Sequence, residues 1–346
     1  MIRFRRAFTS LELLVVIAII VMVAGILLPS LGQARRAASR GTGAGQRHAI
    51  GQALAIYGNE WNNAIPGSGW TSASGLYADL DSATLLPGIS NDNCPNVCGL
   101  FGWMSPLGRT MGLELDSGAS LASRLARFDT LRHAKIFTCP DNDYQAPPFG
   151  LPTVPVGPIL SYTAGLNFDF AAAPRALPPA EGDNRLWAAP AIGYTPADSY
   201  RPRQDLVGDP SAKIFVADGA KFSTTNNPPD VSFAIMTRVG GPWADWGCYA
   251  RYSRSWDRGL APGNGNLNGG ATDARLYGFR HGRQTPGAAG GYRLNAVFFD
   301  GHSETLDEKA ACDPSLWTPS GTIIPAAEAD VDVNQWYFHD QSVISQ

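Results

Sequence analysis

The chain has 346 residues, of which 44% are hydrophobic and 16% are charged, and its formal net charge is −3. This balance provides no basic surface of the kind that nucleic-acid-binding proteins carry, so the sequence predicts no nucleic-acid partner. Glycine (38 residues) and proline (26 residues) are frequent but follow neither a collagen period nor a low-complexity repeat, which favours a loop-rich domain with strands.

An apolar run follows a short basic leader at the N-terminus. Residues 8–28 make up 21 positions, and Glu12 is their only charged member. A helix of this length, at about 1.5 Å per residue, spans about 30 Å, which is the thickness of a bilayer core. The run therefore predicts a transmembrane helix. Because a carboxylate is costly in that environment, it also predicts a partner for Glu12.

A secretory signal peptide is the alternative interpretation of the same segment. Gly32-Gln33-Ala34 offers small residues for a signal peptidase that would cut after Ala34. A carboxylate inside the apolar region weakens such a signal, so we prefer the anchoring interpretation. Arginines flank the run on both sides, and their distribution alone does not fix its orientation.

The stretch RRAFTSLE, followed by a continuous apolar helix, resembles the N-terminus of type IV prepilins and type II secretion pseudopilins. The resemblance implies cleavage by a prepilin peptidase between Ala7 and Phe8, followed by N-methylation of Phe8. Alanine stands before the cut where the family usually has glycine. In an assembled filament, the carboxylate of Glu12 would neutralise the Phe8 amine of a neighbouring subunit and thereby fix the register of the helices.

The same resemblance implies the organisation of the chain. A leader at residues 1–7 would precede a transmembrane helix at 8–28, a helix continuation and linker at 29–61, and a β-rich globular head at 62–346. The protein would then be a single-pass protein of a bacterial inner membrane, with a cytoplasmic N-terminus and a periplasmic or extracellular head. Its implied partners are the prepilin peptidase and other pilin or pseudopilin subunits, and nothing indicates what the head binds.

The segment after the apolar run predicts a continued helix that carries the head. Ile50, Leu54, Tyr57 and Trp61 recur at helical spacing and form one apolar face. Three glycines between residues 41 and 45 each cost up to about 1 kcal/mol in a helix relative to alanine, which predicts a local break there.

For the head, the sequence predicts an α+β fold in which a loop-rich antiparallel sheet packs on the long helix, as in pilins. A helix is expected at residues 120–133, where apolar residues recur on one face. Strands are expected in apolar runs bounded by turn residues, at 135–140, 160–168, 212–219 and 293–306. Within the last run, Asp300-Gly301 predicts a two-residue hairpin turn with positive φ at both positions. Residues 223–273 are too polar and irregular to assign.

Three motifs in the head extend the resemblance to a large pseudopilin-like family that is abundant in planctomycetes. They are a Cys-Pro pair, the segment SYTAGLN, and a histidine followed at a distance by Asp-Gly-His. The gap of 18 residues between the first histidine and the aspartate is longer than is usual in that family. The motif residues are Cys139, Pro140, Ser161, Tyr162, Asn167, His281, Asp300, Gly301 and His302.

Two chemical interpretations of His281, Asp300 and His302 compete with a structural one. The three residues could ligate a metal, or act as a base and its orienting group in a hydrolase. In the structural interpretation, Asp300 forms a turn and His281 bonds across it. We prefer the latter because the sequence shows no further placed ligand and no nucleophile signature. The aspartate-rich segments at 91–93 and 141–144 lack the twelve-residue calcium pattern and are interpreted as surface turns.

The five cysteines are Cys94, Cys98, Cys139, Cys248 and Cys312. Disulfides persist in the oxidising compartment that the resemblance implies for the head. We predict a disulfide between Cys94 and Cys98, with zinc as the weaker alternative because no second matching pair is present.

These patterns together predict a membrane-tethered pilin-like or pseudopilin subunit, with no catalytic residue, metal or cofactor. The alternative is an exported, membrane-anchored globular enzyme or glycan-binding protein on a signal-anchor helix.

Overall fold

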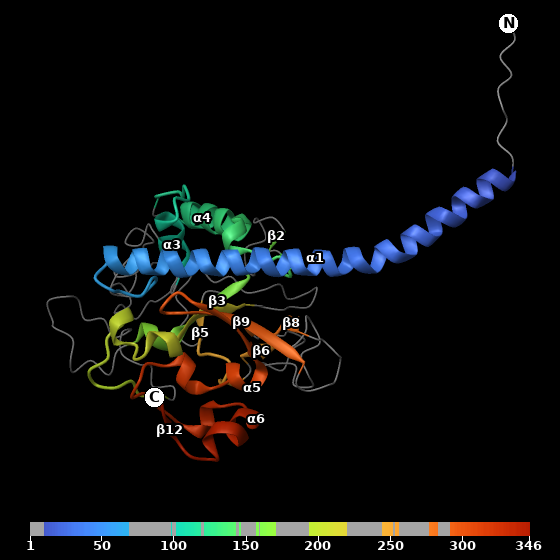
Figure 1. The fold of residues 1–346 in the computed structure, drawn as a ribbon. Helices are drawn as coiled ribbons and strands as arrows, with labels where there is room; N and C mark the ends of the chain where they lie inside the picture. The colour runs from blue at the N-terminus through green and yellow to red at the C-terminus, as the bar shows by residue number, and fades with distance from the viewer. Residues whose placement is uncertain are drawn as a thin grey trace, which may run out of the picture. The chain divides into compact units, whose positions relative to one another are not determined.

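The fold is α+β, with an N-terminal helix and a largely antiparallel sheet (Figure 1). The computed structural model describes residues 10–68, 98, 102–118, 121–142, 145–146, 157–158, 160–170, 194–219, 244–251, 253–255, 277–282 and 291–346. The chain forms two compact units, Met1–Gly45 and Gln46–Gln346.

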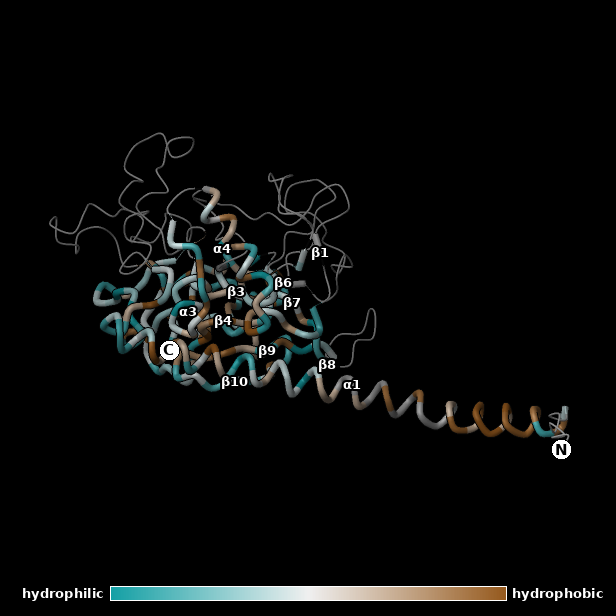
Figure 2. Tube along the Cα trace, turned by 90° about the horizontal axis from the view of Figure 1, so that it is seen from above, coloured by the Kyte–Doolittle hydropathy of each residue, from teal (hydrophilic) through white to brown (hydrophobic). Residues whose placement is uncertain are grey.

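Helix α1, Ser10–Glu60, is continuous over 51 residues and contributes to both units. The predicted break at residues 41–45 is therefore wrong, because the cost of three glycines is small once good helix formers on both sides have nucleated the helix. Figure 2 shows that the most hydrophobic part of α1 is its N-terminal part, where the large apolar side chains that the structure describes at residues 11–23, 28 and 31 are 43–73% exposed.

Among the helices of the described residues, none combines the length and the apolar character that are needed to cross a membrane.

The sheet of the second unit has six strands in the order β10-β9-β4-β3-β5, with β8 also paired to β9. All pairs are antiparallel except β3 with β5. The strand bounds are β3 Tyr162–Gly165, β4 Ile214–Asp218, β5 Ala244–Asp245, β8 His281–Gly282, β9 Tyr292–Phe298 and β10 Ser303–Asp307.

The strands predicted at 212–219 and 293–306 are confirmed as β4 and as the β9–β10 hairpin. Only the first half of the strand predicted at 160–168 forms, because the chain turns into the 3₁₀ helix Leu166–Asp169 after β3. The strand predicted at 135–140 is wrong. Lys135–Phe137 is a 3₁₀ turn that begins two residues after a helix ending at His133, and its backbone is satisfied locally by the bond from the Phe137 N–H to the Ala134 carbonyl.

The β9–β10 turn differs from the two-residue turn predicted. The Phe298 N–H donates to the His302 carbonyl and the Gly301 N–H donates to the Phe298 carbonyl, both at 3.0 Å, which leaves a three-residue loop. Among the loop residues only Gly301 has a positive φ, +88°, so Asp300 takes an ordinary conformation. This arrangement is a type I turn followed by a bulge, the usual geometry of three-residue hairpin loops.

In the view of Figure 1, the helices α3, Met104–Thr110, and α4, Leu121–His133, lie above the C-terminal part of α1, and the sheet lies below it. The helix predicted at 120–133 is thereby confirmed. Of the predicted apolar stripe on α1, Ile50, Leu54 and Tyr57 are buried, whereas Trp61 is 46% exposed and stacks on Tyr57. The last turns of α1 therefore form part of the core of the second unit.

Short elements complete the described chain. The strands are β1 Gln145–Ala146, β2 Gly157–Pro158, β6 Arg254–Ser255, β7 Tyr277–Gly278, β11 Ile323–Ile324 and β12 Val343–Ile344. The helices are α5 Glu308–Ala311, α6 Val331–Val333, a π-helical turn at Asn334–Phe338, and 3₁₀ turns at Gln204–Leu206, Pro210–Ala212, Pro314–Trp317 and Ala326–Glu328.

Candidate functional site

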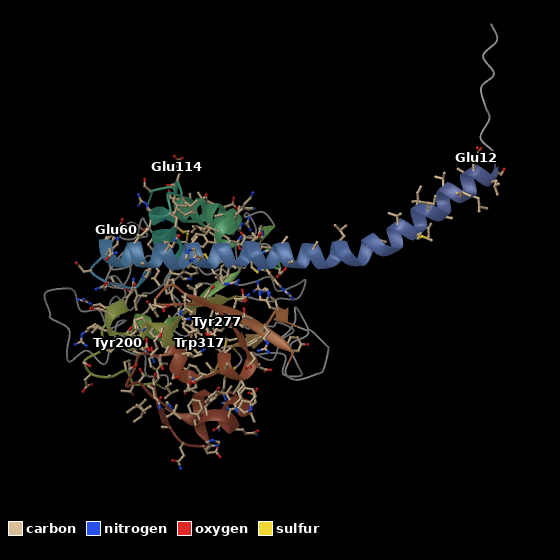
Figure 3. All side chains as sticks on the ribbon, viewed as in Figure 1. Glu12, Glu60, Glu114, Tyr200, Tyr277 and Trp317 are labelled. Carbon is tan, nitrogen blue, oxygen red and sulfur yellow. The ribbon has the colours of Figure 1, made fainter. Side chains whose placement is uncertain are left out.

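The predicted processing site, Ala7 and Phe8, lies outside the described residues, so cleavage there stays a prediction. Glu12 lies in the first turn of α1 (Figure 3). Cys94 also lies outside the described residues. Cys98 is buried with its Sγ 3.2 Å from the Ser105 Oγ, and its disulfide with Cys94 stays a prediction.

A polar cluster forms where two strands share one edge of β9. Strand β4 pairs with residues 296–298 of β9, and β8 pairs with residues 292–293 on the same edge. The end of β4 therefore meets the start of β8. This brings the His281 Nε2 within 3.0 Å of the Asp218 Oδ2, and the same oxygen accepts the Asn295 N–H at 2.7 Å.

The electrostatics of this pair favour the charged form of both residues. Burial lowers the pKa of His281, but Asp218 and Cys139 together outweigh this effect and raise the pKa to about 9. Burial raises the pKa of Asp218, but His281, Arg280 and the hydrogen bond from the Asn295 N–H together lower it by more, so the pKa of Asp218 lies below its usual value. The two atoms lie at ion-pair distance, although the angles of a hydrogen bond are not met.

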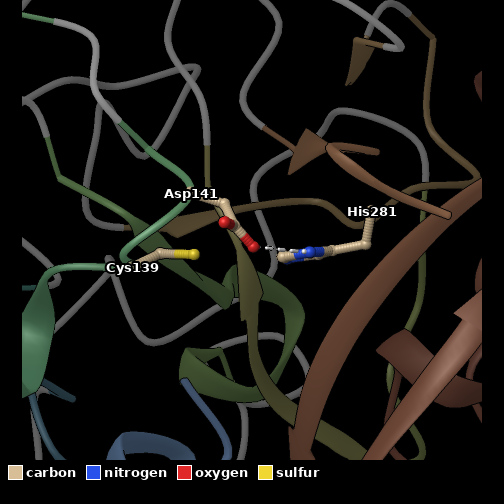
Figure 4. A group of neighbouring side chains, drawn as sticks. All are labelled: Cys139, Asp141 and His281. Carbon is tan, nitrogen blue, oxygen red and sulfur yellow. Dashed lines mark ion pairs between the residues drawn. The ribbon is translucent and has the colours of Figure 1, made fainter. Parts of the chain in front are cut away.

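The turn after the 3₁₀ helix at 135–137 brings two more side chains to His281. The Asp141 Oδ2 lies 3.3 Å from the His281 Nδ1, on the side of the ring opposite Asp218. The side chain of Cys139 is buried, and its Sγ, a carboxylate oxygen of Asp141 and a ring nitrogen of His281 all lie within 4.8 Å of one another (Figure 4).

This turn is tied to the start of β3, where the second motif begins. The Asn142 N–H donates to the Cys139 carbonyl at 2.9 Å, and its Nδ2 donates to the Ser161 Oγ at 3.0 Å. Next to Ser161, the ring of Tyr162 is fully buried. Burial, with the nearby charge of Asp218, raises the pKa of Tyr162. The fold therefore gathers Cys139, Ser161, Tyr162 and His281 in one region of the head, although they are far apart in sequence.

Asp300, Gly301 and His302 lie elsewhere, at the opposite end of β9. His281 is opposite Arg293 and the turn follows Phe298, which at about 3.4 Å per residue separates the two places by roughly 20 Å. Asp300 makes the turn, and its Oδ1 lies 2.6 Å from the His302 Nδ1. The interpretations that joined His281 to Asp300 and His302, as metal ligands, as a catalytic pair or as partners across the turn, are therefore wrong.

Asn167, the last residue of SYTAGLN, lies in a third place, among buried aromatic residues. Its Nδ2 donates to the Trp246 carbonyl at 2.5 Å and to the Trp317 carbonyl at 3.0 Å, and lies 3.2 Å from the Tyr249 Oη. Trp317 also packs on Tyr277 (Figure 3). Asn167 thus joins three segments of the head and faces no solvent.

The sequence reasoning missed two members of the cluster. Asp218 and Gly219 end an apolar strand, in the same pattern as Asp300-Gly301. This similarity is the one local signal in the sequence that marks Asp218 as a candidate site residue. Asp141 was assigned to a surface turn, and nothing in its local sequence shows that the turn faces a strand more than a hundred residues away.

Comparisons with protein-family models, with curated proteins and with solved structures gave no match for this chain.

Proposed function

We propose that the chain is a pilin-like or pseudopilin subunit that is anchored in a bacterial inner membrane and assembles through its N-terminal helix. The observation that carries the proposal is the combination of an apolar run with one carboxylate and a single helix that continues from this run into the head. The apolar run begins at Phe8, whereas the described residues begin at Ser10. That the whole run inserts into a membrane is part of the proposal.

The exposure of this run supports the proposal. The described large apolar side chains of α1 at residues 11–23, 28 and 31 are exposed in the single chain, and an apolar surface of this size requires lipid or another apolar surface to cover it. Neighbouring subunits in a filament would provide similar helices. The apolar face of the C-terminal part of α1 packs in the core of the head through Ile50, Leu54 and Tyr57.

Processing by a prepilin peptidase is the first test of the proposal. Co-expression with the peptidase is expected to shorten the chain by seven residues and to leave Phe8 as the first, methylated residue. Intact-mass measurement and N-terminal sequencing check this result. A mature chain that begins at Met1 contradicts the proposal. A chain that begins at Arg35 favours an exported enzyme or glycan-binding protein.

Glu12→Ala is expected to impair assembly while leaving membrane insertion intact. Removal of the carboxylate lowers the cost of insertion but leaves the Phe8 amine of the neighbouring subunit without its counter-charge. Co-purification of two differently tagged copies from extracted membranes should fall roughly tenfold or more, because a buried charge without its partner costs several kcal/mol.

Glu60→Ala is the matched control, because it removes an exposed carboxylate from the other end of the same helix (Figure 3). It should leave co-purification unchanged. Equal co-purification of wild type and Glu12→Ala would refute the role of Glu12 in assembly.

A further inference from the structure

We propose that Cys139, Asp141 and His281 form a zinc-binding site in the head. A thiolate, a carboxylate and an imidazole are all suitable zinc ligands, and their ligand atoms lie within 4.8 Å of one another. The sequence predicted no metal, because these residues come from two distant segments and follow no known ligand spacing.

The geometry of two of the three ligands already fits a zinc ion. The distance between the Asp141 Oδ2 and the His281 Nδ1 is 3.3 Å. Two such atoms bound at about 2.1 Å to a tetrahedral zinc are about 3.4 Å apart. Cys139 and Asp141 belong to one turn, which the bond from the Asn142 N–H to the Cys139 carbonyl closes. The thiol therefore needs only a small displacement to complete a three-residue ligand set.

The carboxylate of Asp218 beside His281 is a second, independent feature that favours a metal site. Histidines that bind metals usually donate their other ring N–H to a carboxylate, which fixes the orientation of the ring. The carboxylate of Asp218 lies beside this nitrogen, at an ion-pair distance of 3.0 Å from the Nε2, and is itself fully buried and held by the Asn295 N–H. Its Oδ1 is buried without a hydrogen-bond partner among the described residues. With this carboxylate beside the Nε2, the Nδ1 of the same ring faces Asp141.

The chemical nature of the three ligands favours zinc over magnesium and calcium. Magnesium and calcium prefer sites made of oxygen atoms alone, whereas a sulfur, a nitrogen and an oxygen together suit a borderline-soft ion such as zinc. Three protein ligands leave a fourth position for water, which can reach the site because the side chain of Asp141 is 34% exposed. A bound zinc would join the turn at residues 139–141 to β8.

A nucleophilic thiol is the competing assignment, with His281 as its base and Asp218 as the orienting group. Two observations disfavour it. Cys139 is only 1% exposed, so a substrate carbonyl could not reach its sulfur, and the carboxylate of Asp141, 3.3 Å from the Nδ1, competes with the thiol for that nitrogen.

Zinc binding by the full-length chain tests the proposal. Protein purified in a mild detergent and stripped with a chelator is titrated with zinc chloride by calorimetry, and one ion per chain is expected. Cobalt(II) is then used as a spectroscopic probe, because a cobalt–thiolate bond gives a charge-transfer band that oxygen and nitrogen ligands do not give. Circular dichroism of each variant confirms that the fold is retained.

Substitutions distinguish the residues that bind zinc from those that do not. Asp141→Asn, at a partly exposed position, should weaken zinc binding by roughly tenfold or more. Cys139→Ser should do the same and abolish the charge-transfer band. Asp218→Asn, behind the histidine, should weaken binding roughly 10-fold to 100-fold with the band retained. His302→Gln is the matched control. His302 also lies beside an aspartate, but it does not belong to the group of Cys139, Asp141 and His281, so the substitution should leave zinc binding unchanged.

Three results would overturn the zinc site. The first is a wild-type chain that binds no zinc, and the second is a Cys139→Ser variant that binds it as tightly as wild type. The third is a thiol at Cys139 that iodoacetamide alkylates rapidly, equally with and without zinc, which would favour the nucleophile instead.

Discussion

Gly51→Ala is expected to lower the free energy of unfolding of the head by about 2 kcal/mol, although alanine is the better helix former. Gly51 lies in α1 where the backbone of the helix touches the turn between β9 and β10. A Cβ at this position would lie 2.7 Å from the Cα and 2.9 Å from the carbonyl carbon of Gly301, and closer still to its carbonyl oxygen. Because all three are backbone atoms, either the helix or the hairpin must move.

Thermal unfolding of the full-length chain, followed by near-ultraviolet circular dichroism, measures this loss. Gly45→Ala is the matched control, since it makes the same change in the same helix at a position where a Cβ meets nothing within 4 Å. It should leave the melting temperature unchanged or raise it slightly. Equal melting temperatures for Gly51→Ala and wild type would contradict the close approach of α1 to the hairpin.

The elements that could be predicted from the sequence are those whose signal is local. The apolar stripe at Ile50, Leu54 and Tyr57 and the run that forms β4 each show their period within a few residues, and both form as predicted. The error at residues 135–140 has the opposite cause. A short apolar run forms a strand only if a partner strand lies beside it, and this segment instead follows α4 and buries Phe137 in the core from a 3₁₀ turn.

The candidate site could not be predicted because it depends on register between distant segments. Asp218 and His281 meet only because β4 and β8 pair with successive parts of the same edge of β9. Nothing in either segment specifies that shared edge. The motif residues instead suggested that His281 belonged with Asp300, which is closer in sequence but lies at the other end of β9.

Among the motif residues, Asn167 has a buried amide whose hydrogen-bond donors are held by backbone carbonyls. It is fully buried, and its Nδ2 supplies the two N–H groups that satisfy the carbonyls of Trp246 and Trp317. Its Oδ1 has no hydrogen-bond partner among the described residues. The opposite orientation of the amide would place that oxygen against both carbonyls, so the site requires a donor at this position.

Asn167→Asp is therefore expected to destabilise the head more than Asn167→Ala does. The alanine variant removes the hydrogen bonds that Asn167 donates to the carbonyls of Trp246 and Trp317, at a cost of about 1–3 kcal/mol. The aspartate variant adds a buried carboxylate, whose oxygens would face carbonyl oxygens at 2.5 Å and 3.0 Å from the present Nδ2. Burial raises the pKa of such a carboxyl group, so the folded state binds a proton more readily than the unfolded state, and the extra loss should shrink as the pH falls.

Urea unfolding of the full-length variants at pH 7 and at pH 5 measures both effects. Asn142→Asp is the matched control, because the partner of this buried amide is the hydroxyl of Ser161, which can rotate and donate to a carboxylate. Its loss should be smaller than that of Asn167→Asp at pH 7. If the gap between Asn167→Asp and Asn167→Ala instead widens on acidification, the acceptors at Asn167 are not the two carbonyls, and the link between the motif, Trp246 and Trp317 is wrong.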